Sequence, residues 1–263
     1  MMKIGLVQAP SLKDANANLK IIERYAKEAK DQGCEVICFP ECFLTGYAPE
    51  ESKKLALSKN CEAIRMLSKM SIDQQIDILA GFMESEDDDY YITHGIFKAN
   101  GKTDFYRKTH LGEKESLYFS GADILPVFNL SNGVKFGIQL CVEIHFPEIT
   151  KTLSLRGAEV VFAPHAVPKK AGGRKDIWTK IIPARSYDNR VYMACCNQWD
   201  AKCFGGGCLV TNPRGDVVAE YLEDNEKLLL TEIDIKEVER YHQENPGKRY
   251  RYYPSKGRAE LYE

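Results

Sequence analysis

The sequence predicts an α/β protein in which two mixed β-sheets stack face to face, with helices on both outer faces. Strand and helix patterns alternate over residues 3–82, and a similar rhythm returns over residues 134–232. An Asn-Gly turn at 100–101 joins two further strand patterns and is typical of an antiparallel hairpin, so the sheets are expected to be mixed. Since no linker, fixed-period repeat or low-complexity stretch divides the chain, we interpret residues 1–263 as one domain.

The first half has the order strand, helix, strand, helix, strand, followed by the hairpin. Its first helix is marked by apolar residues at helical spacing, namely Leu19, Ile22 and Ala26, and Gly33 is a stop signal. Runs of apolar and β-branched residues between turn signals indicate the strands. The expected strands cover residues 3–8, 35–39, 75–82, 90–98 and 103–108, and the expected helices cover 14–32 and 52–70.

The second half is organised around the segment 134–148. Phe136, Ile138 and Leu140 alternate with other residues and share one face of a strand, so Cys141 lies where that strand ends. A helical pattern follows within a few residues, which places the thiol in a sharp strand-to-helix connection. Backbone N–H groups and a helix N-terminus there are expected to favour a thiolate. The later expected elements are strands at 159–163, 191–196, 207–211, 217–221 and 227–232 and a helix at 176–189.

Composition narrows the class of partner. The chain has 36 basic and 38 acidic residues, a formal net charge of -2, which gives no basic footprint for nucleic acid or an anionic membrane. A small molecule is therefore the expected partner. No apolar run reaches the length of about 18 residues needed to span a bilayer, and the N-terminus leads into a strand pattern instead of a signal peptide. We expect a cytoplasmic protein.

The nine cysteines are better explained as reduced thiols than as disulfides or as ligands of a metal site. Nine is an odd number, and most of the cysteines lie in apolar strand-like runs. The spacing of Cys34, Cys38 and Cys42 is the one arrangement suggestive of a metal, but the strand signal at 36–39 prevents these side chains from stacking as they would on a helix. We therefore expect neither a bound metal nor a cofactor.

Three chemically capable side chains each follow a predicted strand. Glu41 follows the strand at 35–39, Lys108 follows the strand that ends near Arg107, and Cys141 follows the central strand. Sites form where strand ends and their loops converge. An acid, a cation and a thiol brought together in this way would make a covalent hydrolase. Glu41 would move the proton, while Lys108 and the backbone N–H of Val142 would stabilise the oxyanion.

Eight short motifs occur along the chain in a fixed order. They are Phe-Pro-Glu at 39–41, Thr-Gly-Tyr at 45–47, Tyr-Arg-Lys-Thr-His-Leu at 106–111, Cys-Val-Glu at 141–143, Phe-Pro-Glu at 146–148, Ala-Arg-Ser-Tyr-Asp-Asn at 184–189, Asn-Pro-Arg-Gly at 212–215 and Glu-Ile-Asp at 232–234. This ordered set resembles the nitrilase, or carbon-nitrogen hydrolase, superfamily.

The resemblance implies a four-layer αββα sandwich, a Glu-Lys-Cys triad at Glu41, Lys108 and Cys141, and assembly into homodimers or larger homo-oligomers. It also implies a second glutamate, matched by Glu115 four residues before Phe119, which would keep Lys108 charged and orient the amide or water.

Departures from the family pattern leave the substrate subclass open. Nitrilases usually carry Cys-Trp-Glu and amidases or carbamoylases Cys-Tyr-Asp, whereas this chain has Cys-Val-Glu, and His145 stands where an arginine is usual. The Phe-Pro-Glu continuation favours an amide. Val142, His145 and His165 are candidates for substrate contact, and Glu115 has the alternative of being a solvated loop carboxylate.

The leading hypothesis is a cofactor-free hydrolase of small amide or carbamoyl compounds that releases ammonia through an acyl-thioester on Cys141. One alternative is a nitrilase that attacks a small nitrile with the same residues and forms a thioimidate. An alternative of another class is a non-catalytic binding or scaffold protein. The presence of Glu41, Lys108 and Cys141 together argues against the scaffold, because a scaffold has no chemical need for all three.

The loop at 168–175 is a second basic feature. It carries four basic residues around a Gly-Gly pair, at Lys169, Lys170, Arg174 and Lys175. We favour a solvated surface loop over a loop that closes on an anionic substrate.

The C-terminal tail at 241–263 is expected at a subunit interface, since Tyr and Arg are enriched in interface cores. Light scattering at micromolar concentration is expected to give at least twice the 29.8 kDa of one chain. A monomeric mass would contradict this prediction. The residues concerned are Tyr241, Tyr250, Tyr252, Tyr253, Tyr262, Arg249, Arg251 and Arg258.

Overall fold

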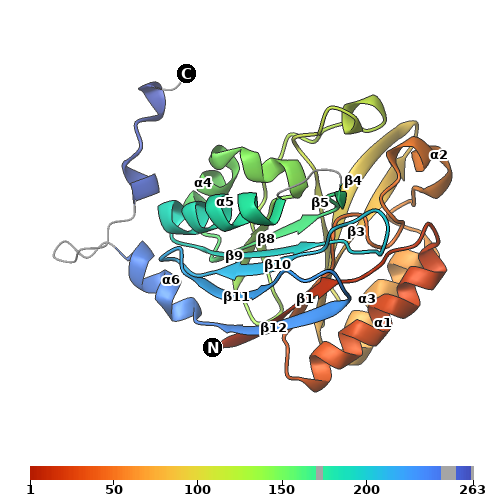
Figure 1. Ribbon diagram of the computed structural model, residues 1–263, viewed down its shortest axis with the longest axis horizontal. Coiled ribbons are helices and arrows are strands. Elements are labelled where there is room, and N and C mark those ends of the chain that lie inside the picture. The colour runs from red at the N-terminus through yellow and green to blue at the C-terminus, as the bar shows by residue number, and fades with distance from the viewer. Residues whose placement is uncertain (170–173, 244–252, 262–263) are drawn as a thin grey trace.

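The computed structural model describes residues 1–169, 174–243 and 253–261. In these residues two six-stranded sheets stack face to face (Figure 1). Helices cover the outer face of each sheet, so the layers run helix, sheet, sheet, helix. The predicted αββα sandwich is confirmed.

The first sheet is mixed and has the strand order β12-β1-β2-β3-β4-β5. The strands β1, β2 and β3 are parallel to one another, whereas β4, β5 and β12 each run antiparallel to their neighbours. The strand bounds are β1 Met2–Gln8, β2 Val36–Cys38, β3 Asp77–Glu86, β4 Asp89–Phe97, β5 Thr103–Arg107 and β12 Lys227–Ile233.

The second sheet is also mixed and has the order β11-β10-β9-β8-β7-β6. Its central strands β7, β8 and β9 are parallel, and the outer strands are antiparallel. The bounds are β6 Phe128–Asn129, β7 Lys135–Ile138, β8 Val160–His165, β9 Tyr192–Asn197, β10 Cys208–Thr211 and β11 Val217–Tyr221.

Four longer helices cover the sandwich (Figure 1). On the first sheet, α1 (Ala15–Asp31) and α3 (Glu62–Gln74) bury one apolar face against the strands. On the second sheet, α4 (Pro147–Leu155) and α5 (Arg174–Asn189) do the same. The predicted stop at Gly33 is confirmed, because this glycine has a φ of 82°, in the left-handed region where glycine ends helices.

The main core lies between the two sheets. Leu6 and Leu79 of the first sheet face Ile138 and Phe162 of the second, and all four are fully buried. Phe136 and Leu140 lie in the same core, so the predicted alternation along the strand before Cys141 is confirmed. The side chains of β7 therefore fix this strand tightly against the opposite sheet.

The helix predicted over 52–70 is wrong as one continuous element, because residues 56–61 are not helical, whereas residues 62–70 lie in α3 as predicted. The chain forms only the short helix α2 (Ser52–Leu55), and Leu57 then pairs with the edge of β3 before α3 begins. The Leu57 N–H donates to the Met83 carbonyl at 2.9 Å, and the Ser85 N–H donates to the Leu57 carbonyl at 3.0 Å. These sheet contacts outweigh the local helical pattern.

The C-terminal part has two features that the sequence analysis did not assign. Strand β12, the last predicted strand, pairs antiparallel with β1 and so completes the first sheet. After it, Asp234 caps the helix α6 (Ile235–His242), which we had not predicted, by accepting a hydrogen bond from the Lys236 N–H at 3.1 Å.

Parts of two expectations lie outside the described residues. Residues 170–173 belong to the basic loop, and residues 244–252 and 262–263 belong to the tail. The described part of the tail contains two short 3-10 helices at 253–256 and 259–261. No helix in the described part of the chain combines the length and the apolar character needed to span a membrane.

Candidate active site

Two sharp turns present the acid and the thiol. Glu41 follows β2 and Cys141 follows β7, and in each turn a residue other than glycine is left-handed: Cys42 has a φ of 52° and Cys141 a φ of 47°. Such residues are uncommon and tend to occur at functional sites. Gly81 of β3 makes room for the first turn, because a Cβ there would lie 2.6 Å from the Cys42 nitrogen.

The Lys108 ammonium lies between two carboxylates. Its Nζ is 2.8 Å from Glu41 Oε1 and 2.9 and 2.8 Å from the two oxygens of Glu115. All three side chains are buried. Burial alone would lower the pKa of Lys108, but electrostatic interactions with Glu41, then with Cys141 and then with Glu115 outweigh it and raise this pKa above its ordinary value. Lys108 is therefore a fixed positive charge.

One oxygen of Glu41 is held and the other is available. Oε2 is buried and has no hydrogen-bond partner among the residues that the structure describes. Burial raises the pKa of Glu41 to about 7, against the lowering effect of Lys108 and with a further raising effect of Glu115. A carboxyl group with this pKa exchanges a proton readily near neutral pH.

Cys141 is partly exposed and is the first residue of a 3-10 helix at Cys141–His145. Burial and then the charge of Glu41 raise the pKa of its thiol to about 12, although Lys108 and a backbone hydrogen bond from Ala166 act in the opposite direction. The expected thiolate is therefore wrong for the resting molecule, because the short helix and one ammonium do not offset desolvation and two nearby carboxylates. The thiol needs a base.

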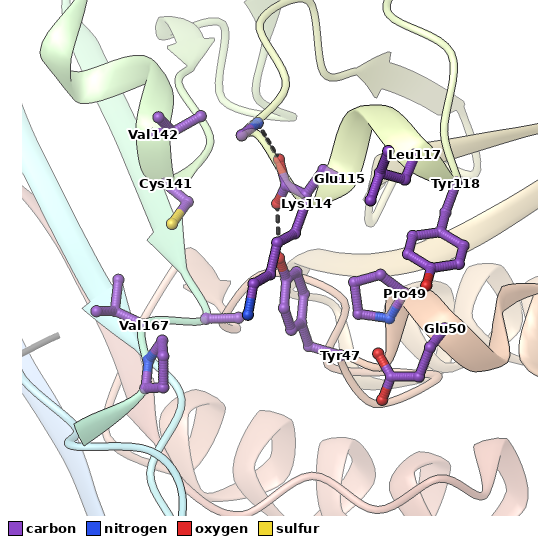
Figure 2. Close-up of a pocket in the computed structure, with 13 residues that line it drawn as sticks. Tyr47, Pro49, Glu50, Lys114, Glu115, Leu117, Tyr118, Cys141, Val142 and Val167 are labelled. Carbon is purple, nitrogen blue, oxygen red and sulfur yellow. Dashed lines mark hydrogen bonds between the residues drawn. The ribbon is translucent and has the colours of Figure 1, made fainter. Parts of the chain in front are cut away.

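Glu115 is only 4% exposed, so the alternative of a solvated loop carboxylate is wrong. The Tyr47 hydroxyl donates to its Oε1 at 2.8 Å, and the Gly112 N–H donates to its Oε2 at 2.7 Å, as the dashed lines in Figure 2 show. Together with Lys108, these contacts hold the carboxylate in one orientation.

Cys141 opens onto a cavity of about 610 Å³. Val142 lines this cavity, but the other two candidates for substrate contact do not. His145 is exposed outside the lining. His165 is buried against Trp178, with ring centroids 4.5 Å apart, and its Nδ1 lies 2.7 Å from the Ala163 carbonyl oxygen. The lining residues are Tyr47, Pro49, Glu50, Gly112, Lys114, Glu115, Leu117, Tyr118, Cys141, Val142, Ala166, Val167 and Pro168 (Figure 2).

The cysteines are free thiols, and Cys34, Cys38 and Cys42 are buried. Within the described ranges, no group of three or more His, Cys, Asp and Glu side chains is arranged to hold a metal ion.

The buried Glu143 is a site residue for which the sequence analysis gave no role. Its carboxylate accepts hydrogen bonds from the Tyr106 hydroxyl at 2.8 Å, the Thr109 N–H at 2.9 Å and the Leu140 N–H at 2.6 Å. It thereby joins the turn that carries Cys141 to the chain on either side of Lys108. A carboxylate in an otherwise apolar segment is the sequence signal that would have pointed to this role.

The family model for carbon-nitrogen hydrolases matches residues 3–243. The chain belongs to the carbon-nitrogen hydrolase family. As a carbon-nitrogen hydrolase it is similar to a nitrilase of Pyrococcus abyssi, at 29% identity over 89% of this chain and 90% of that one. It is also similar to an omega-amidase of Saccharomyces cerevisiae, at 28% identity over 93% and 91% of the two chains. Among solved structures, an amidase from Nesterenkonia has a TM-score of 0.86 at 24% identity, over 100% of this chain and 98% of that chain.

Glu143→Gln is expected to lower the free energy of unfolding by roughly 2–4 kcal/mol. The new side-chain NH₂ group would face the buried N–H and O–H groups that now donate to the carboxylate, so some of these hydrogen bonds would be lost. Chemical denaturation monitored by circular dichroism measures this change. Glu148→Gln, at an exposed position of α4, is the matched control and should change stability by less than about 0.5 kcal/mol. Equal stabilities for the two variants would contradict the role assigned to Glu143.

Proposed function

We propose that this carbon-nitrogen hydrolase cleaves the carbon-nitrogen bond of a small primary amide or carbamoyl compound and releases ammonia. One observation carries the proposal: the Cys141 thiol lines the pocket, and it lies close enough to the Glu41 carboxylate, which has an available oxygen, and to the Lys108 ammonium for both charges to shift its pKa. These groups are a nucleophile, a base and an electrostatic stabiliser.

In the first step, the Cys141 sulfur attacks the amide carbon while Glu41 takes the thiol proton. The base is required because the pKa of the thiol is raised to about 12, so few thiolates form unaided. The carbonyl oxygen becomes an oxyanion, which Lys108 and the backbone N–H of Val142 stabilise.

In the second step, Glu41 returns the proton to the amide nitrogen, the carbon-nitrogen bond breaks, and ammonia leaves a thioester on Cys141. Water then attacks the thioester. Glu41 takes a proton from the water and delivers it to the leaving sulfur, so the carboxylic acid is released and the thiol is restored. Glu115 positions Lys108 and orients the amide or the water throughout.

The relatives support this proposal for the reaction type. One is an omega-amidase and another is an N-carbamoylputrescine amidase of Arabidopsis thaliana. In a structure of a mutant of the Nesterenkonia amidase, the acetamide moiety of fluoroacetamide is covalently attached to the active-site cysteine. A small amide group can therefore bind next to the active-site cysteine in a protein of the same fold.

The test is ammonia release by the purified protein across primary amides, carbamoyl compounds and nitriles. Cys141→Ala should abolish release, and Lys108→Met should reduce kcat/KM by about a hundredfold, as the loss of one oxyanion donor typically does. Cys61→Ala, at the start of α3, is the matched control and should retain activity. Wild-type turnover by Cys141→Ala would refute the mechanism. Hydrolysis of nitriles alone would favour a nitrilase, and release from no compound would favour a binding protein.

The value of kcat/KM is expected to rise with pH through about 7. Glu41 accepts the thiol proton only when it is ionised, which requires a pH above its raised pKa. Initial rates at low substrate between pH 5.5 and 8.5 measure this limb. A profile that stays flat across this range would contradict Glu41 as the base.

A further inference from the structure

We infer that the preferred substrate is a primary amide whose far end is an α-amino acid, with its carboxylate bound by Lys114 and its ammonium bound by Glu50. This inference rests on the proposed amide hydrolysis and adds the chemical class of the substrate. Lys114 and Glu50 belong to the pocket, and neither is part of the proposed catalytic machinery.

The pocket has three described charged residues, and one of them is already neutralised. Glu115 is held by Lys108, Tyr47 and Gly112 and offers no free charge to a ligand. Lys114 and Glu50 are exposed, and neither head group forms a hydrogen bond or ion pair with any residue that the structure describes. The pocket therefore presents one cation and one anion that a ligand can bind.

The two charges come from separate segments. Lys114 directly precedes the 3-10 helix at Glu115–Leu117, whereas Glu50 lies in the 3-10 helix at Pro49–Glu51, after β2. Figure 2 shows both side chains among the residues that line the pocket onto which Cys141 opens. A ligand that carries a carboxylate and an ammonium on one carbon atom can bind both residues together. A ligand with only one of these charges leaves one of the two residues without an opposite charge, and its own charge can repel that residue.

The rest of the wall is apolar around the thiol. Val142, Ala166, Val167 and Pro168 are among the lining residues, and Figure 2 shows Val142 and Val167 on the same side as Cys141, with Tyr47 across from them. A short chain of methylene groups suits this part of the pocket wall, because the wall has no free charge here that could bind a polar linker. The order from the thiol outward is thus amide, aliphatic linker, charged end.

Four amides with the same linker test the inference: L-glutamine, glutaramate without the ammonium, 4-aminobutanamide without the carboxylate, and butanamide without either charge. The wild-type protein should have its highest kcat/KM on L-glutamine. Lys114→Met should lower kcat/KM by about tenfold for L-glutamine and glutaramate, because a charge-assisted hydrogen bond is lost, and should leave butanamide unchanged.

Glu50→Gln should have the reciprocal effect. It should lower kcat/KM by about tenfold for L-glutamine and 4-aminobutanamide and raise it for glutaramate, since a like charge is removed. Lys53→Met and Glu113→Gln change exposed charges outside the pocket lining and should leave all four values unchanged. Butanamide hydrolysed as well as L-glutamine, or equal losses on all four amides in either variant, would overturn the inference and leave amide hydrolysis standing.

Calorimetric titration of Cys141→Ala with L-glutamine separates binding from turnover. Binding that weakens about tenfold when Lys114→Met or Glu50→Gln is added supports the inference. If L-glutamine binds in this way but no amide releases ammonia, the proposed function fails and the assignment of the two charges survives. Absence of L-glutamine binding would overturn the assignment.

Discussion

The contact on which the site depends is the burial of one ammonium between two carboxylates. A lone Lys108 ammonium would be strongly destabilised away from water, and Glu41 and Glu115 at 2.8 Å make its charge tolerable. The three residues come from different parts of the first sheet and its loops. The ion cluster therefore brings the ends of β2 and β5 and the segment at 112–115 to one place, and Tyr47 extends the same network.

The thiol belongs to the other sheet, so its position depends on how the two sheets pack. The apolar face of β7 fits between the sheets, and Glu143 adds a polar connection at the point where that strand ends. Because this carboxylate contacts both Leu140 and Thr109, a shift of one sheet would move the donors around it as well as the apolar core. The geometry between Lys108 and Cys141 is thus coupled to the main core of the protein.

Hydrophobic periodicity and turn residues in the sequence predicted the strands and helix ends that are determined by neighbouring residues. The alternation around Ile138 and the stop at Gly33 follow from strand and helix geometry, and the positions of Glu41, Lys108 and Cys141 after strands follow from the same pattern. The extended Leu57 could not be predicted in this way, since the edge of β3 supplies its hydrogen bonds.

The properties of individual side chains were harder to predict, because they depend on three-dimensional surroundings. The ionisation of Cys141 is set by burial and by charges brought from distant segments. The burial of His165 against Trp178 likewise comes from the packing of α5 on β8. The presence of Lys114 and Glu50 in the lining of one pocket also brings together residues that have no common motif.

The buried Glu41 also links folding to proton uptake. An unfolded chain would release this proton near its ordinary pKa of 4.5, whereas the folded protein retains it up to about 7. Between these values the native state binds more protons than the unfolded state, so the contribution of Glu41 to stability is greatest at low pH and declines as the pH rises. The ionised form that suits proton transfer is thus the form that the fold holds less favourably.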